Sequence, residues 1–222
     1  MRHRLNDLLA KLQGSWMGAV AACVLYPMMY LPHLIGAYVN ALICERLINA
    51  WPRIGGVGLF KSAAALTREL VESGRFKTVA LGGNRAEKDQ FLEQYRPEHH
   101  VILGSADGTS SQAEQVVWYA KARCLRQICL ITHESLLTRA VLTVLKELRK
   151  QGLCLPVYCE AYLAPERLEL RWYEVVLASA NEALSLLRYQ RRGHVSTCRE
   201  ALRYQQSVDW GSPAEGTLFV IL

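Results

Sequence analysis

FKTVALGG (residues 76–83) opens a series of four short apolar runs, each followed by a segment with helical spacing of apolar residues. The other three runs are HHVILG (99–104), QICLITH (127–133) and LCLPVYC (153–159). Runs of this length that alternate with helices are typical of βα units, in which helices cover a parallel sheet. The sequence therefore predicts a parallel sheet. Pro156 predicts that its fourth strand lies near an edge, because proline cannot donate to a strand ladder.

Helices are predicted around these strands from apolar residues spaced three and four positions apart. They cover residues 58–73, 85–95, 109–123 and 135–152. Gly74 and Gly152 follow two of them as helix stops, and Ser110 or Ser111 would cap the first turn of the third. Together the pattern predicts a three-layer αβα, Rossmann-like fold.

After Leu163 the alternation stops. Pro165 is tolerated in a first helical turn, and residues 166–193 then have the pattern of one long helix. Residues 198–204 predict a further helical turn, and TLFVIL (217–222) predicts a terminal strand or docking segment. We therefore predict three regions: an N-terminal extension (1–57), an α/β core (58–163) and a C-terminal helix with a tail (164–222).

The extension contains a run, Ser15 to Cys44, without any Asp, Glu, Lys or Arg. Its length would span a bilayer, and its aromatic residues resemble those found at membrane interfaces. Pro27 and Pro32 interrupt a helix and favour instead a buried first strand at AVAACVLYP (19–27), followed by a buried helix. Both interpretations stay open. The preceding MRHRLNDLLAKLQ (1–13) is basic and amphipathic, as in organellar targeting segments or in a surface helix.

Composition narrows the class of protein. The 222 residues carry 26 Lys and Arg against 20 Asp and Glu, which gives a net charge of +6 and suits an anionic partner without requiring one. A hydrophobic share of 51% and a charged share of 21% exclude a disordered chain. The 7 cysteines include no C-x-x-C pair, which predicts buried reduced thiols rather than a disulfide framework.

Three strand ends are candidate ligand sites. In an open parallel sheet, ligands bind where the carboxyl ends of strands lead into helix N-termini. These ends are residues 81–84, 104–110 and 132–135. Their Gly, Ser and Thr residues would offer N–H groups and hydroxyls to an anion, but the same residues are common in ordinary turns.

The order of these ends resembles the SanA/YdcF-like (ElyC-type) domain family over roughly Leu59 to Leu163. ALTRELVESGRFKTVALGGN (65–84) is similar to the family's helix and glycine-bearing strand end. ICLITHESLLTRA (128–140) is similar to its V-T-S-x-x-H-x-x-R-A motif. SADGTSSQAEQ (105–115) stands where the family has E-x-x-S-x-N-T, and EALSLLRYQRRGHV (182–195) resembles its closing helix. The resemblance implies a ligand site made by Gly82, Gly83, Asn84, Ser110, Thr132 and Arg139.

The sequence departs from the family's pattern at polar positions. The family's loop histidine aligns with Leu136, its asparagine with Thr109 and its glutamate with Gly104. At the predicted first strand, Tyr26 and Pro27 replace glycines, so the backbone there loses an N–H group and close access to an anion. The resemblance therefore implies a scaffold whose ligand site has lost several of the family's polar groups.

Two residues are weak candidates for proton transfer. His133 suits this role because imidazole titrates near neutrality, and Glu87 is the early acid of its helix. A loop histidine also caps helices or faces solvent, and Arg139 would either bind an anion or pair with a neighbouring acid. His99 and His100 lack a spaced partner, so no metal and no cofactor are expected. No nucleophile motif is present either.

A basic segment ends the long predicted helix. Arg188, Arg191 and Arg192, with Tyr189 and His194 among them, would lie on RNA phosphates or on an anionic lipid surface. The other interpretation is a solvated helix end, where the helix dipole favours cations.

These features favour a chain that is more scaffold than enzyme. We expect a non-catalytic accessory subunit of a larger assembly that is membrane-associated and organellar, in the mitochondrion, with the bacterial envelope as the alternative. It would contact other protein subunits, and a membrane through residues 15–44. The alternatives are an enzyme or binding protein for a small anionic or nucleotide-like ligand in envelope metabolism, and an RNA-contacting subunit.

Overall fold

A computed structural model describes residues 16–55, 61–104, 108–162, 172–211 and 216–221. The chain divides into two compact units, residues 1–40 and residues 41–222. Helix α2 (Trp16–Asn49) contains the boundary between them. The second unit holds the sheet.

Five strands form one parallel sheet in the order β2-β1-β5-β3-β4. Their bounds are β1 (Phe76–Gly82), β2 (His100–Ile102), β3 (Ile128–His133), β4 (Val157–Tyr162) and β5 (Gly216–Ile221). The four strands predicted between residues 76 and 159 are confirmed. Strand β4 lies at an edge of the sheet, as Pro156 predicted, and Cys154 precedes it.

The central strand is the most C-terminal one. β5 pairs with both β1 and β3, so it holds the place that the first strand has in the usual doubly wound order. The first strand predicted at residues 19–27 is wrong, because those residues belong to α2. An apolar run of alanines and valines suits a buried strand or a buried helix equally well. The central position that a first strand usually occupies in such a sheet is held by β5 instead.

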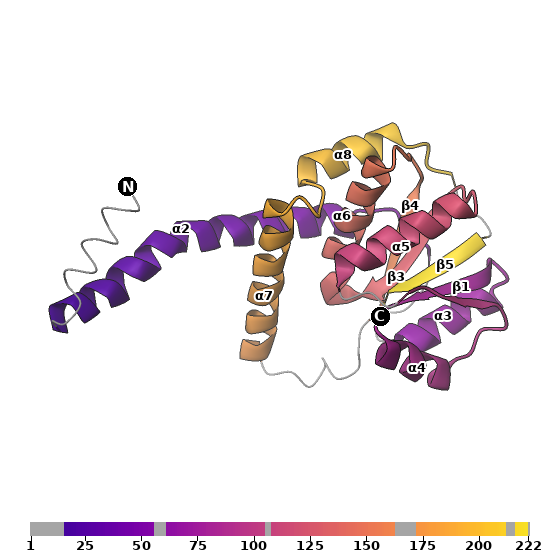
Figure 1. The fold of residues 1–222 in the computed structure, drawn as a ribbon, viewed down its shortest axis with the longest axis horizontal. Coiled ribbons are helices and arrows are strands. Elements are labelled where there is room, and N and C mark those ends of the chain that lie inside the picture. Colours follow the sequence, from indigo (N-terminus) through magenta and orange to yellow (C-terminus); the bar gives the residue numbers. More distant parts are fainter. Residues whose placement is uncertain (1–15, 56–60, 105–107, 163–171, 212–215, 222) are drawn as a thin grey trace. The chain divides into compact units, whose positions relative to one another are not determined.

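Helices cover both faces of the sheet, which makes three layers (Figure 1). The first face carries α3 (Ala63–Glu72) and α4 (Arg85–Gln94), which pack on one hydrophobic cluster. The second carries α5 (Thr109–Ala122), α6 (Glu134–Lys150), α8 (Cys198–Ser207) and the C-terminal end of α2 on another cluster. The Rossmann-like αβα class predicted from sequence is therefore correct.

Residues on both sides of the predicted core belong to the same unit as the sheet. Ile48 and Trp51 are buried in the core of the second face, and the indole N–H of Trp51 donates to the Val157 carbonyl at 2.7 Å. The division at residues 40 and 41 thus differs from the boundary predicted at residue 57. Helix α7 (Trp172–Arg191), α8 and β5 also belong to this unit.

Cys44 and Cys198 form a disulfide, with 5.6 Å between their Cα atoms. The expectation that all cysteines are reduced is therefore wrong. The two residues lie 154 positions apart, and only the packing of α2 and α8 on the same face brings them together. Cys129 and Cys159 are buried thiols, and burial raises the pKa of each to about 12. Cys23 lies outside the described side chains.

Helix starts differ in one respect from the prediction. Gly108, with a φ of 112°, is the N-cap of α5 and no side chain caps that helix. Ser111 instead donates to the Gly108 carbonyl at 3.1 Å. A serine one or two residues inside the helix already has helical backbone angles, so it cannot take the extended N-cap conformation.

None of the helices in the described ranges combines the length and the apolarity that crossing a bilayer requires.

Helix α8 starts with a reciprocal capping box. The Thr197 N–H donates to a Glu200 carboxylate oxygen at 2.9 Å, and the Glu200 N–H donates to the Thr197 hydroxyl at 3.2 Å. The Thr197 hydrogen bonds, with Lys146 and Arg149 nearby, hold the pKa of Glu200 below its ordinary value. The carboxylate therefore stabilises the folded protein wherever it is ionised.

We expect Glu200→Gln to lower the free energy of unfolding by about 1 kcal/mol at neutral pH. A lowered folded-state pKa gives stability that is present above the ordinary glutamate pKa, about 4.3, and is lost as pH falls through the folded value. The difference between wild type and variant should therefore shrink below about pH 4 in urea unfolding series. The exposed Glu114→Gln is the control. A difference that stays constant over this pH range would contradict the argument.

Candidate ligand site at the carboxyl edge of the sheet

The predicted site residues gather at one edge of the sheet, because all five strands are parallel. β1 ends at Gly82, β3 at His133 and β4 at Tyr162. Helices α4, α5 and α6 follow the strands that end at this edge and begin near them. The strand ends that carry the predicted residues therefore lie at one edge of the sheet.

The sheet nevertheless separates the candidates into two groups. Side chains alternate along a strand, and Ile131 packs with the α3/α4 cluster while Leu130 packs with the α5/α6 cluster. His133 therefore lies on the α3/α4 face and Thr132 on the α5/α6 face. Arg139, on α6, lies on the Thr132 side. The candidates are therefore divided between the two faces of the sheet.

Asn84 and Glu87 are used by the start of α4. The Glu87 N–H donates to Asn84 Oδ1 at 3.0 Å, and the Asn84 N–H donates to Glu87 Oε2 at 2.9 Å. This reciprocal arrangement is a capping box, in which the side chains satisfy N–H groups that a helix leaves unpaired. Asn84, predicted as a ligand group, and Glu87, a weak candidate for proton transfer, thus have a structural role at the start of α4.

His133 is the N-cap of α6. The backbone N–H of Ser135 donates to His133 Nδ1 at 3.2 Å, and the Ser135 hydroxyl lies 2.8 Å from the same nitrogen. Nδ1 accepts the backbone hydrogen bond, so the ring proton of neutral imidazole is on Nε2. A general base needs a lone pair that the fold does not use, and here the helix start uses it.

Tyr162 is the residue at this edge that the sequence did not indicate. It pairs with His133 across β3 and β4, and the two rings lie edge to face with centroids 5.3 Å apart. Burial, followed by the charge of Glu87, raises the pKa of Tyr162 to about 12. The phenol is therefore protonated at neutral pH. Only strand pairing brings it to His133, and no local motif marks it.

Arg139 is paired within the fold. Its Nε lies 3.3 Å from Glu182 Oε1, and its guanidinium lies over the Tyr189 ring at 5.3 Å. Both partners come from α7, which the sequence predicted as a helix but did not place beside Arg139. The arginine predicted to bind an anion is thus paired with a carboxylate of the same chain.

The start of α5 is also covered by α7. A Cβ on Gly108 would lie 3.3 Å from the Tyr189 hydroxyl oxygen, so that group occupies the space beside the helix start. Ser110 Oγ lies 3.4 Å from His194 Nδ1. The buried hydroxyl of Thr132, by contrast, has no hydrogen-bond partner in the described part of the chain.

The glycine pair has a backbone role. A Cβ on Gly82 would lie 3.7 Å from the Val220 carbonyl oxygen and 3.8 Å from an Ile221 side-chain carbon, so β5 covers this glycine. Gly83 has a φ of 125°, a conformation that glycine adopts without strain. Gly104 lies two residues after β2, and a Cβ on it would lie 3.0 Å from the Gln115 amide nitrogen.

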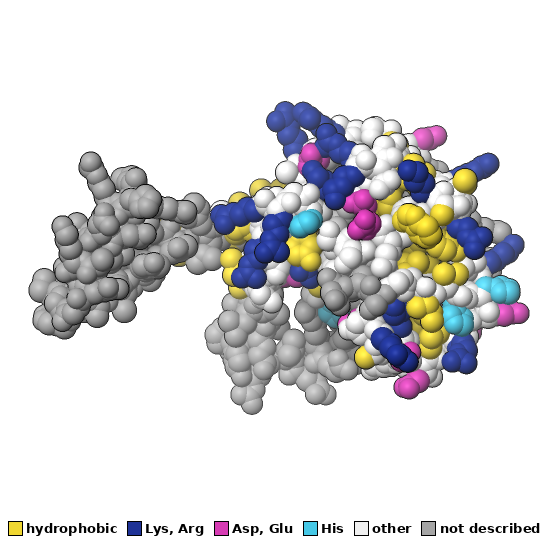
Figure 2. Space-filling view, in the orientation of Figure 1, with side chains coloured by type: hydrophobic (Ala, Val, Ile, Leu, Met, Phe, Trp, Pro, Cys, Tyr) yellow, Lys and Arg dark blue, Asp and Glu magenta, His cyan; other side chains and the backbone are white. Residues whose placement is uncertain are grey.

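Among the residues that the structure describes, no three His, Cys, Asp or Glu side chains are grouped so that they could hold a metal ion. The three arginines at the end of α7 are exposed, as a solvated helix end would be. Figure 2 shows lysine and arginine side chains over α8 and the C-terminal end of α7.

The fold defines the class, a Rossmann-like three-layer α/β protein, and among the described residues at its carboxyl edge Asn84, Glu87, His133 and Arg139 interact with other groups of the chain. Comparison of the chain with models of known families, with curated proteins and with solved structures gives no match. The resemblance to the SanA/YdcF-like family therefore stays a prediction.

Proposed function

We propose that this chain is a non-catalytic accessory subunit of a larger membrane-associated assembly, built on a degenerate SanA/YdcF-like domain. The observation that carries the proposal is the use of candidate polar groups by the fold itself. Asn84 and Glu87 cap α4, His133 caps α6, and Arg139 pairs with Glu182. A site that binds charged substrates keeps such groups oriented toward the ligand.

The surface of α2 supports a docking role. Several large apolar side chains between residues 31 and 43 are 42–54% exposed. They are Leu31, Ile35, Tyr38, Val39, Leu42 and Ile43. The run from Ser15 to Cys44 contains no Asp, Glu, Lys or Arg, so its complement is an apolar surface rather than a charged one. An apolar helix of a partner subunit at the membrane has this chemistry.

The disulfide indicates whether the protein works in an oxidising or a reducing compartment. Disulfides persist in oxidising compartments such as the bacterial periplasm and are rare in the cytosol. Of the locations considered from sequence, an oxidising envelope compartment therefore suits Cys44–Cys198 better than a reducing organellar interior. We propose that the second unit works on the oxidising side of a membrane.

The proposal is tested on the exposed face of α2. We expect the wild-type chain to sediment with membranes of its own cells in a complex larger than 25.0 kDa, and Ile35→Glu with Leu42→Glu to abolish this. Both side chains are about half exposed, so the sheet domain should stay folded. Leu202→Glu, a 45% exposed leucine on α8, is the matched control and should sediment normally. A wild-type chain found only as a monomer outside the membrane fraction would overturn the proposal.

The small-anion alternative predicts a different result. A nucleotide or phosphosugar that raises the melting temperature of wild type but not of Arg139→Ala would favour it over the scaffold proposal. The RNA alternative predicts salt-sensitive binding that weakens in Arg191→Ala or Arg192→Ala. We expect neither result, because Arg139 already has its carboxylate and the α7 arginines have the pattern of a solvated helix end.

A further inference from the structure

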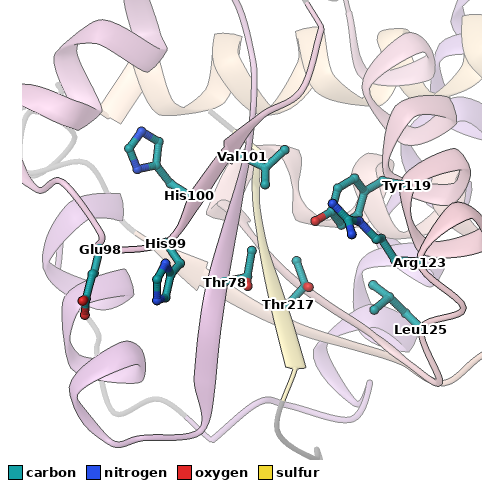
Figure 3. Close-up of a pocket in the computed structure, with 9 residues that line it drawn as sticks. All are labelled: Thr78, Glu98, His99, His100, Val101, Tyr119, Arg123, Leu125 and Thr217. Carbon is teal, nitrogen blue, oxygen red and sulfur yellow. The ribbon is translucent and has the colours of Figure 1, made fainter.

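A pocket of about 590 Å³ lies at the opposite, amino edge of the sheet (Figure 3). It opens between the starts of β1, β2 and β5 and the C-terminal end of α5. Its volume is in the range of small-molecule sites. None of the residues predicted from sequence as ligand groups lines it.

Two threonines form its floor. Thr78 of β1 and Thr217 of β5 are neighbours in the parallel pairing and lie between the two walls in Figure 3. Thr217 is 9% exposed. In the described ranges neither hydroxyl forms a hydrogen bond with another residue, so both can donate to a ligand.

Arg123 forms one wall. It is the C-cap of α5, where the carbonyl end of the helix dipole stabilises a cation. Its guanidinium lies over the Tyr119 ring, 5.8 Å from the centroid, and has no ion pair among the residues described. Stacking orients a guanidinium while leaving its N–H donors at the edge, which suits an oxyanion.

The edge strand β2 closes the pocket on its other side. Val101 pairs with Ala80, which packs on the α5/α6 cluster, so the Val101 side chain lies on the same face of the sheet as Thr78 and Thr217. His100 pairs with Val79 of the α3/α4 cluster, so its imidazole points to the opposite face (Figure 3). The polar side chains on the α5 face of the pocket are therefore those of Arg123, Thr78 and Thr217, together with the Tyr119 hydroxyl.

We infer that this pocket binds a small molecule that carries an oxyanion, a phosphate or a carboxylate group. The oxyanion would accept hydrogen bonds from Arg123, Thr78 and Thr217. The inference is independent of the scaffold role proposed above, since it concerns the opposite edge of the sheet.

Isothermal titration of the full chain with glucose 6-phosphate, gluconate, inorganic phosphate and glucose tests the site. We expect saturable binding of glucose 6-phosphate or gluconate, at least about tenfold tighter than that of glucose. Binding by only one of the two identifies the oxyanion. Arg123→Gln should weaken binding at least about tenfold, and Thr217→Val several-fold. Arg126→Gln, an exposed arginine three positions further along, should bind as wild type does.

Three results would overturn the inference: no saturable binding of any probe, equal losses in Arg123→Gln and Arg126→Gln, or equal binding of glucose and its phosphate. Arg123 is exposed, so its variant should fold, and far-ultraviolet circular dichroism checks this. Loss of binding in Arg139→Ala but not in Arg123→Gln would move the ligand to the carboxyl edge. That result would overturn both this inference and the scaffold proposal.

Discussion

Phe219→Ala is expected to lower the free energy of unfolding by about 3–5 kcal/mol, a large part of the stability of a domain this size. Phe219 is fully buried in β5, the strand shared by β1 and β3, and its ring lies edge to face with Tyr119 at 5.9 Å. Truncation leaves a cavity between the sheet and α5. Urea unfolding followed by circular dichroism measures the loss.

The matched control for this variant is Trp118→Ala. Trp118 neighbours Tyr119 on α5 but is 68% exposed, so its truncation should change stability by less than about 1 kcal/mol. Similar losses in the two variants would contradict the central position of β5. A variant of Phe219 that does not fold at all agrees with it, provided that Trp118→Ala folds.

The disulfide should make a contribution of similar size. Cys44 and Cys198 are 154 residues apart, and closing so long a loop in the unfolded chain removes entropy worth about 5 kcal/mol in the chain-entropy model. We expect the Cys44→Ser, Cys198→Ser double variant to lose about 3–5 kcal/mol. Unfolding with and without reductant measures the same quantity in the wild-type chain.

Two controls separate the effect of the disulfide from the effect of removing a thiol or adding reductant. Cys124→Ser removes an exposed thiol and should leave the unfolding midpoint unchanged. Reductant should destabilise wild type and leave the double variant unaffected. If wild type unfolds at the same urea concentration in both conditions, the disulfide does not form in the protein.

Local sequence was sufficient for much of the fold. Strand β3 and helix α6 were predicted within a residue or two, because their apolar residues repeat with a period that suits each element. Pro156 indicated an edge strand through its missing N–H. The αβα class followed from the alternation alone.

The residues of the candidate site were predicted only in part, because the sequence of a strand end gives the polar residues there but not the groups with which they pair. The sequence placed His133 and Arg139 near one edge but could not assign their partners. His133 is paired with the start of its own helix, whereas Arg139 is paired with Glu182 of α7, 43 positions further along. Whether a polar group serves a ligand or the fold depends on distant residues that only packing selects.

By itself, the sequence determined the strands and helices between residues 63 and 162, because periodicity and backbone propensity act over a few neighbouring residues. It did not determine that residues 19–27 are helical, because an apolar run without a clear period suits either element. Tertiary structure decided that residues 217–221 form the centre of the sheet, that Cys44 meets Cys198, and that a pocket opens at Arg123. The physical reason is that each of these depends on contacts between segments far apart in the chain, which the burial of the whole core determines together.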